Sequence, residues 1–448
     1  MTRYWCEYAW LGGAAASAGV LVEVDGDRIA HVTVDQPFTP SAVRLDGLTL
    51  PGLANSHSHA FHRALRGRTQ VGTGSFWTWR DQMYALAAVL DPDSYYELAR
   101  AVYGEMVLAG VTCVGEFHYL HHGRDGVPYS DPNAMSAALV AAAADVGVRL
   151  TLLDTCYLRG GIGVAPNEVQ ARFSDGSAEG WAERVDAAAH LGSPRVRIGA
   201  AVHSVRAVDP EAIDLVARWA HLATAPLHAH VSEQPAENEQ CVDAFGCSPT
   251  ELLARCGALE ERFTAVHATH LTDRDIALLG AHHNTICMCP TTERDLADGI
   301  GPALALRDAG AWLAVGSDSH AVIDLFEEAR AIELDGRLAS RERGQHDTVS
   351  LLAAATHQGH ESLGWADAGR IAEGSLADLV TVRLDTVRTA GAGADSLLET
   401  AVFASAAADV HHVVVSGQVV VTEGWHVRLD VAADLGRSIA RAWKEATA

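Results

Sequence analysis

The sequence predicts an α/β fold, a (β/α)8 barrel with a small β-sandwich domain built from both chain ends. The chain has 448 residues, a length that suits a large barrel with a smaller accessory domain. Strand-like and helix-like segments alternate from about residue 47 to residue 340, as they do in a parallel barrel. The segments on either side of this block are strand-rich and contain glycine turns.

Eight segments inside the alternating block have the apolar character of buried strands. In chain order they are residues 48–57, 110–118, 148–157, 196–204, 226–233, 263–270, 284–290 and 311–320. Between them, residues 93–110, 211–223 and 272–283 carry apolar residues three and four apart, the spacing of an amphipathic helix. Eight strands that alternate with helices predict a closed parallel barrel.

Both ends of the chain are expected to pair into one accessory domain. Strand patterns occupy residues 19–34 near the start and residues 375–384 and 410–425 near the end. We therefore expect three parts. They are residues 1–50 as the N-terminal β-sandwich part, 51–364 as the barrel, and 365–448 as the C-terminal β-sandwich part with a terminal helix.

Composition and charge narrow the possible partners and the location. A formal net charge of −24 would repel a phosphate backbone or an anionic membrane surface, so we expect neither nucleic acid nor membrane as a partner. No uninterrupted apolar run has the length that a bilayer requires. The N-terminus, with Arg3 and then Glu7, does not favour a secretory signal, and the eight cysteines show no disulfide spacing. These features predict a cytoplasmic protein.

Lysine is almost absent from the chain. Lys444, four residues before the C-terminus, is the sole lysine. A Schiff base, a phosphate-loop lysine and a carbamylated lysine between two metals are therefore excluded from the barrel, because arginine stays protonated and cannot replace lysine in these roles. The glycine-rich stretch 160–163 has no adjacent lysine, so we do not interpret it as a phosphate loop. An anionic substrate would have to be bound by arginines.

Polar side chains follow the predicted barrel strands at the ends where barrel enzymes have their active sites. These residues are His57, His59, Glu116, His118, His203, His230, His267 and Asp318. His57 and His59 are two residues apart on a strand end, so both point to the same side and can bind one zinc ion. His230 and Asp318 can complete a site of nitrogen and oxygen ligands.

Several of these residues also have simpler interpretations. Asp318 could merely cap the following helix, and His228 could be either a ligand or a packed neighbour of His230. The HYLHH stretch at 118–122 is either a small cluster of its own or a loop that leaves the second strand. For the remaining isolated histidines we expect a solvated surface position. They are His62, His121, His122, His282 and His283.

The motifs resemble those of the amidohydrolase superfamily, in its deaminase branch with a single metal. The general motifs are PGLANSHSH, the HxxE of His230 and Glu233, the sixth-strand His267, and GSDSH around Asp318. More specific motifs resemble the N-formimino-L-glutamate deiminases of histidine degradation over nearly the whole chain. They are SFWTWRDQMY (75–84), GEFHYLHH (115–122), HSVRAV (203–208), HVSEQ (230–234), VHATH (266–270) and TTERDLADGI (291–300).

This resemblance implies a barrel of the amidohydrolase type and a catalytic centre. One divalent metal ion per chain, with Zn²⁺ the expected ion, would be bound by His57, His59, His230 and Asp318. Glu233 would take a proton from the attacking water and deliver it to the departing nitrogen, while His267 and Asp318 would orient that water and stabilise the intermediate. The implied reaction converts N-formimino-L-glutamate to N-formyl-L-glutamate and ammonia, and the implied assembly is a homodimer.

The same resemblance implies how a dianionic small-molecule substrate would be recognised. The substrate-binding residues would be His62, Arg80, Tyr119, His203 and Arg206. Guanidinium groups suit this role because they bind carboxylates through paired hydrogen bonds. The family pattern has glutamine at the position of His62. A neutral imidazole can accept a hydrogen bond from an amidine N–H, but it lacks the paired donor and acceptor of an amide.

Two other functions fit parts of the pattern. One is a related mononuclear amidohydrolase that deaminates another amidine, a guanidine or an aminated ring; the arginine pair counts against a neutral, purine-like substrate. The other is a catalytically silent barrel that binds partners, but such a scaffold needs neither four metal ligands nor Glu233 and His267.

Overall fold

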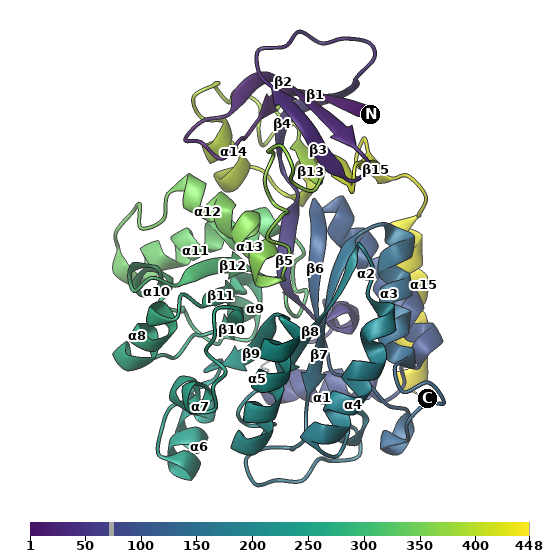
Figure 1. Cartoon of the computed structure of the whole chain (residues 1–448), viewed down its shortest axis with the longest axis vertical. Coiled ribbons are helices and arrows are strands. Elements are labelled where there is room, and N and C mark those ends of the chain that lie inside the picture. The colour runs from purple at the N-terminus through teal and green to yellow at the C-terminus, as the bar shows by residue number, and fades with distance from the viewer. Residues whose placement is uncertain (71–75, 448) are drawn as a thin grey trace.

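The computed structural model describes residues 1–70 and 76–447. Of the motif at 75–84, Ser75 therefore lies outside the described residues. Within these ranges the chain forms two sheets (Figure 1), one with the order β12-β11-β10-β9-β8-β7-β6-β5 and one with the order β16-β15-β14-β13-β4-β1-β2-β3. No helix in the described part of the chain combines the length and the apolar character needed to cross a membrane.

The first sheet is the barrel. Its described strands are β5 (Leu53–Ser58), β6 (Val111–His118), β7 (Arg149–Cys156), β8 (Val196–Val202), β9 (Leu227–Val231), β10 (Phe263–His267), β11 (Thr285–Met288) and β12 (Trp312–Val315). All neighbouring strands pair in parallel. Most strand residues are buried, because side chains of a barrel strand face either the barrel interior or the outer helices. The predicted (β/α)8 barrel is confirmed.

The barrel closes between its first and last strands. An isolated parallel bridge joins Ser58 to Asp318, where the Asp318 N–H donates to the His57 carbonyl at 3.0 Å and the His59 N–H donates to the Asp318 carbonyl at 3.3 Å. Gly316 permits this approach, since a Cβ there would lie 2.8 Å from the His57 Cβ. The seam of the barrel therefore runs through three predicted metal ligands.

Helices surround the barrel and connect its strands. They are α1 (Phe76–Ala87), α2 (Pro92–Leu108), α3 (Ala134–Val146), α4 (Ala178–Ala187), α5 (Pro210–Ala223), α6 (Pro235–Phe245), α7 (Pro249–Arg255), α8 (Asp273–Ala281), α9 (Pro290–Asp295), α10 (Ala303–Asp308), α11 (Leu325–Ser340), α12 (Thr348–Ala355), α13 (His357–Ser362), α14 (Leu397–Phe403) and α15 (Val431–Ala446). Short 3-10 helices occupy η1 (Ala60–Leu65), η2 (Arg124–Gly126), η3 (Gln170–Phe173), η4 (Ala188–Leu191) and η5 (Ala407–Asp409). Aspartates followed by proline begin α2 and α5, where Asp91 and Asp209 accept hydrogen bonds from backbone N–H groups of the first turn.

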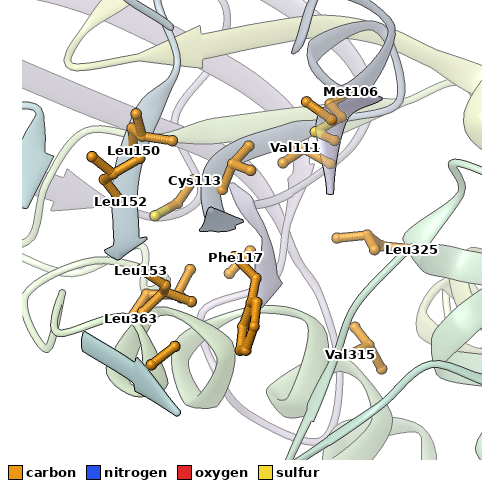
Figure 2. Packing of buried hydrophobic residues seen from close by; sticks show 14 of the residues in the cluster. Met106, Val111, Cys113, Phe117, Leu150, Leu152, Leu153, Val315, Leu325 and Leu363 are labelled. Atoms are coloured by element: carbon orange, nitrogen blue, oxygen red, sulfur yellow. The ribbon is translucent and has the colours of Figure 1, made fainter. Parts of the chain in front are cut away.

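The barrel core lies between the strands and these helices. Figure 2 shows part of it, with Cys113 and Phe117 of β6 near Leu150 and Leu153 of β7. The register of the two strands pairs Phe117 with Leu153. All eight cysteines are buried and carry free thiols, as the sequence predicts for a chain without a disulfide framework.

The second sheet combines both ends of the chain. Its described strands are β1 (Thr2–Ala9), β2 (Ser17–Asp25), β3 (Arg28–Thr33), β4 (Val43–Pro51), β13 (Leu379–Val382), β14 (Val410–Val415), β15 (Gln418–Thr422) and β16 (Trp425–His426). The two ends meet where β4 pairs antiparallel with β13. Side chains from both ends, including Tyr4, Val22, Leu379 and Val414, form one apolar cluster. The predicted β-sandwich domain from both chain ends is confirmed, while the bounds at residues 51 and 364 remain a proposal.

The C-terminal helix leaves this sheet and lies on the barrel. In Figure 1, α15 runs alongside α2. The Trp443 indole N–H donates to the Ala64 carbonyl at 2.7 Å, and Arg441 pairs with Glu97 at 3.0 Å. Gly104 of α2 makes room for this helix, since a Cβ there would lie 2.9 Å from a methyl group of Val431.

One fully buried ion pair joins the barrel to the second sheet. The Arg149 Nε, at the start of β7, donates to Asp378 Oδ2 at 2.6 Å, and both side chains are 0% exposed. Asp378 Oδ1 also accepts from the Ser416 N–H at 2.7 Å. Asp378 therefore holds the loop between β14 and β15 against the end of the barrel away from the strand carboxyl ends.

We expect Asp378→Asn to lower the free energy of unfolding by about 3–5 kcal/mol, because it leaves the Arg149 guanidinium buried without its counter-charge. Denaturant unfolding of the full chain measures this change. Asp385→Asn is the matched control, since Asp385 pairs with Arg383 on the exposed surface and its loss should leave the unfolding midpoint unchanged. Equal effects of the two substitutions would contradict the structural role of the buried pair.

Candidate metal centre and substrate pocket

Histidine and aspartate side chains from four strand ends meet at one point. Ligand atoms of His57, His230, His267 and Asp318 all lie within 4.8 Å of one another. The His57 Nε2 lies 3.1 Å from the His230 Nε2 and 3.2 Å from Asp318 Oδ1. His59 joins them, with its Nε2 3.4 Å from Asp318 Oδ1. The structure thus brings together all four predicted metal ligands.

The tautomers of two of these histidines fit a bound metal ion. The His59 Nδ1 lies 2.9 Å from the Phe117 carbonyl, and the His230 Nδ1 lies 2.8 Å from the His203 carbonyl. Each Nδ1–H therefore donates to a backbone oxygen, which leaves the Nε2 lone pair directed at the centre. Converging lone pairs beside a carboxylate are the donor set that a divalent ion such as Zn²⁺ prefers, so these residues could hold a metal.

Burial sets the protonation of the cluster. It lowers the pKa of His57 to about 3 and also lowers the pKa of His59 and His230. Burial alone would raise the pKa of Asp318, but the hydrogen bond from His57 and the charge of His267 outweigh it and hold that pKa well below its usual value. The cluster therefore offers neutral imidazoles and an ionised carboxylate, which are the protonation states that bind metals.

Glu233 and His267 lie beside the cluster. The His267 Nε2 is 3.8 Å from Glu233 Oε1 and 3.9 Å from Asp318 Oδ2, while its Nδ1 is 3.4 Å from Glu293 Oε1. Although burial opposes protonation, the carboxylates of Glu233, Glu293 and Asp318 raise the pKa of His267 well above its usual value. Burial raises the pKa of Glu233. An imidazolium N–H thus lies between the predicted proton carrier and a predicted metal ligand.

Strained backbone marks the segments that carry these groups. The residues with left-handed φ angles include Ser232 at 51°, His267 at 67° and Asp318 at 41°. This conformation is uncommon for residues other than glycine, and it persists where the surrounding structure fixes it. His267 and Asp318 belong to the cluster, and Ser232 directly precedes Glu233. The strain therefore occurs where the chain turns side chains toward the centre.

A cavity opens above the cluster. All five predicted substrate-binding residues line it, together with Glu233, His267 and Asp318. They are His62, Arg80, Tyr119, His203 and Arg206. The wall also contains Arg159, Tyr157 and two glycines of the stretch 160–163. Sequence reasoning missed Arg159, although it follows the third barrel strand at the same end as the other polar residues. Three guanidinium groups therefore face the cavity.

Arg206 is fixed by a residue that the sequence did not single out. Its Nε donates to Glu237 Oε2 at 2.9 Å, and its Nη2 lies 3.9 Å from Glu233 Oε2. The other oxygen of Glu237 accepts from the Ser232 N–H at 3.0 Å. Burial opposes the charge of Arg206, but Glu237 and Glu233 outweigh it and raise the Arg206 pKa. Glu237 therefore positions both Arg206 and the turn that carries Glu233.

The other arginines reach the cavity in different ways. Arg80, on α1, has its guanidinium carbon 5.5 Å from the ring centre of Tyr84 in the next turn of the helix. The Arg159 Nη2 lies 2.9 Å from Asp209 Oδ2, and its side chain is half-exposed. The side chain of Arg206 is therefore more buried than that of Arg159.

Two of the strand-end residues do not face the cavity, contrary to the prediction that they converge with the others. Side chains alternate along β6, so Phe117 and Tyr119 point inward while Glu116 and His118 point toward the helices. Glu116 accepts hydrogen bonds from the Ala60 N–H at 2.7 Å and from the Ser58 hydroxyl at 2.9 Å. Burial raises the pKa of Glu116 to about 8. It supports the end of β5 from outside the pocket.

The prediction of a solvated surface is wrong for three histidines. His62, His121 and His122 are buried, at 2%, 1% and 5% exposure. The reason is that the segments after β5 and β6 turn back over the barrel and are covered by other loops, which periodicity does not reveal. His282 and His283 are exposed, as predicted. The His228 Nε2 lies 2.9 Å from the Ser362 carbonyl, so His228 is a packed neighbour.

Comparison with known proteins identifies the family of the chain. The amidohydrolase family matches residues 48–420. A formimidoylglutamate deiminase of Pseudomonas aeruginosa is 37% identical over 420 residues, 91% of this chain and 90% of that protein. A 5-methylthioadenosine/S-adenosylhomocysteine deaminase of Natronomonas pharaonis is 31% identical and covers 86% of this chain and 84% of its own. The crystal structure of an amidohydrolase from Brucella melitensis superposes with a TM-score of 0.91 at 31% identity, over 99% of this chain and 100% of that one.

The predicted resemblance is thereby confirmed. Both curated relatives are deaminating enzymes, which indicates a hydrolase that acts on carbon–nitrogen bonds. With a family match that spans most of its length, the chain belongs to the amidohydrolase family.

Proposed function

We propose that this chain is a metal-dependent deiminase that hydrolyses N-formimino-L-glutamate to N-formyl-L-glutamate and ammonia, as part of histidine degradation. The observation that carries the proposal is a single cavity with two kinds of wall. The histidine and aspartate cluster with Glu233 lies on one side, and Arg80, Arg159 and Arg206 lie around the rest. A substrate with a reactive amidine and two carboxylates matches both.

The arginines favour a dianion over a neutral ring. Burying a guanidinium costs free energy unless an anion or hydrogen-bond acceptor compensates it. Arg206 has Glu237 as its partner through Nε, and its Nη2 extends toward Glu233 in the cavity. A substrate carboxylate beside Arg206 would add charge-assisted hydrogen bonds. A chain with a net charge of −24 needs such local positive charge to bind an anion.

We propose one Zn²⁺ per chain, bound by His57, His59, His230 and Asp318. When bound, the ion supplies Lewis acidity, which lets a water ionise near neutral pH. Asp318 orients this water as a hydrogen-bond acceptor, and the imidazolium of His267 donates a hydrogen bond to the oxygen that adds to the amidine carbon. The 3.9 Å between the His267 Nε2 and Asp318 Oδ2 supports this joint role.

Glu233 is the proton carrier of the proposed reaction. Its carboxylate takes one proton from the attacking water as the carbon–oxygen bond forms, and then delivers it to the nitrogen of the protonated amidine as the carbon–nitrogen bond breaks and ammonia leaves. The second hydrogen of the water leaves the oxygen as the carbonyl forms and passes to Asp318, which already accepts a hydrogen bond from it. Burial raises the pKa of Glu233, which brings its basicity closer to that of the groups with which it exchanges protons. The Arg206 guanidinium, 3.9 Å away, keeps the carboxylate directed into the cavity.

The competing proposal is a related deaminase of another amidine, a guanidine or an aminated ring. It draws on the curated relative that deaminates 5-methylthioadenosine and S-adenosylhomocysteine. A neutral ring would bring no carboxylate to the three arginines of the cavity wall, and for this reason we favour a dianionic substrate. The cytoplasmic location and the homodimer expected from the sequence remain proposals.

Ammonia release by the zinc-loaded protein tests the substrate. We expect the highest kcat/KM with N-formimino-L-glutamate, and a rise in KM of about 10- to 100-fold with N-formimino-4-aminobutyrate, which lacks the α-carboxylate. Guanine and 5-methylthioadenosine should release no ammonia. Preferred turnover of either ring would reject the proposal and favour the competing one.

Replacing one arginine should change the KM values of the two formimino compounds. Arg206→Met removes a guanidinium while keeping the length of the side chain, so we expect it to raise KM for the dianion and to narrow the gap between the two formimino compounds. Arg218 lies on the exposed face of α5, so Arg218→Met is the matched control. It should change neither the KM for the dianion nor the difference in KM between the two formimino compounds. If Arg206→Met kept the wild-type preference for N-formimino-L-glutamate over N-formimino-4-aminobutyrate, Arg206 would not be a substrate-binding residue.

Glu233→Gln should lower kcat by about 10²- to 10⁴-fold, because an amide cannot accept and release the transferred proton. Its metal content should remain that of the wild type, since Glu233 is outside the proposed ligand set. Glu239→Gln is the control that should keep full activity, because Glu239 is exposed on α6, two residues after Glu237, and does not line the cavity. Wild-type kcat in Glu233→Gln would exclude the proton-carrying role.

A further inference from the structure

His62 and Tyr119 form a hydrogen-bonded pair in the cavity wall. The His62 Nε2 lies 2.9 Å from the Tyr119 hydroxyl oxygen. The other ring nitrogen, Nδ1, is buried and has no hydrogen-bond partner among the described residues. The imidazole packs against the ring of the proposed ligand His59, at 4.5 Å between centres. An unpaired buried nitrogen so close to the reaction centre needs a partner that arrives from outside the chain.

The number of protons on the pair limits what Nδ1 can do. A neutral imidazole carries one hydrogen, on either of its two ring nitrogens, and the phenol of Tyr119 carries one O–H. If Tyr119 donates to Nε2, Nδ1 carries the hydrogen. If the Nε2–H donates to Tyr119, Nδ1 is a bare acceptor and the phenol O–H can donate elsewhere.

We propose that the His62–Tyr119 pair is a tautomeric relay, which couples recognition of a substrate carboxylate at Tyr119 to recognition of the amidine N–H at His62. The relay rests on the proposed function and deepens it. It gives the histidine at this position a specific role in choosing amidines that also carry a carboxylate.

The carboxylate sets the direction of the relay. A carboxylate only accepts hydrogen bonds, and an O–H donated to an anion makes a bond about twice as strong as one donated to a neutral acceptor. Tyr119 therefore turns its O–H to the carboxylate when the substrate binds. The phenol oxygen then accepts from the His62 Nε2–H, and Nδ1 becomes an acceptor.

This tautomer distinguishes the substrate from the product. The reacting group of an amidine carries N–H donors, which Nδ1 can accept. After hydrolysis the same position holds a carbonyl oxygen, which only accepts, so it has no hydrogen bond to form with a bare Nδ1. The relay therefore favours binding of the amidine and release of the formyl product. An amidine without the carboxylate does not set the tautomer and is bound less well.

Nitrogen NMR of ring-¹⁵N-histidine-labelled, zinc-loaded protein reports the tautomer directly, because a bare and a protonated ring nitrogen have widely different shifts. The His62 signals are assigned by their loss in His62→Gln. The probe is glutarate, which has two carboxylates and no amidine, so no turnover is needed. We expect saturating glutarate to convert His62 to the form with hydrogen on Nε2 and bare Nδ1. In Tyr119→Phe, glutarate should leave the His62 tautomer unchanged.

Several outcomes of this NMR experiment would overturn the relay. A His62 tautomer that does not respond to glutarate in the wild type, or glutarate that does not bind at all, would overturn the relay. So would a His62 signal that responds to removal of zinc and not to glutarate, because Nδ1 would then be a metal ligand in the group with His59 and Asp318, whose ligand atoms also lie within 4.8 Å of that of His62.

Kinetics provide the second measurement. We expect His62→Phe and Tyr119→Phe each to lower kcat/KM for the substrate by about 10- to 100-fold, and the double variant to fall little further, since either change alone breaks the relay. Fully additive losses would contradict it. A tautomer that follows glutarate while N-formimino-L-glutamate is not turned over would keep the relay and reject the proposed substrate, so the two failures are distinguishable.

Discussion

The site depends on the closure of the barrel at its own metal-binding residues. The backbone hydrogen bonds that join the first and last strands run between Asp318, His57 and His59. The same residues present Nε2 and carboxylate atoms to the centre. Any shift of the seam would therefore move the ligands, and Gly316 keeps the seam tight by leaving no Cβ beside His57. Fold and chemistry share one set of contacts, so the precision of the centre comes from the sheet itself.

The charges around this centre are arranged in compensated pairs. Glu237 holds Arg206 through one oxygen and the Ser232 N–H through the other, which fixes an arginine and a turn of the catalytic strand end at once. Glu293 Oε1 lies 3.4 Å from the His267 Nδ1 and also accepts from the Cys289 N–H. Because Arg206 and His267 each have a counter-charge within the chain, the cavity can hold a guanidinium and an imidazolium ready for an anion without the cost of an unpaired buried ion.

Much of the fold and of the metal cluster could be predicted from the sequence, because strand alternation and the HxH spacing are local patterns. Side chains alternate along a strand, so His57 and His59 both face the cluster, whereas Glu116 and His118 both face away from it. The prediction failed for Glu116 and His118 because it treated every polar residue at a strand end alike. Glu237 and Glu293 could not be found, since their partners lie 31 and 26 residues away across separate loops. The burial of His62 likewise results from tertiary folding, which one sequence does not reveal.

The most direct test of the central claim is the metal itself. Metal analysis of the purified chain, combined with anomalous diffraction at the zinc edge, measures both the number of ions and their position. We expect one equivalent per chain, at a single peak between His57, His59, His230 and Asp318, and its loss in Asp318→Ala. Two equivalents, no bound metal in freshly purified protein, or a peak away from these four side chains would contradict the proposal that the barrel seam builds a mononuclear centre.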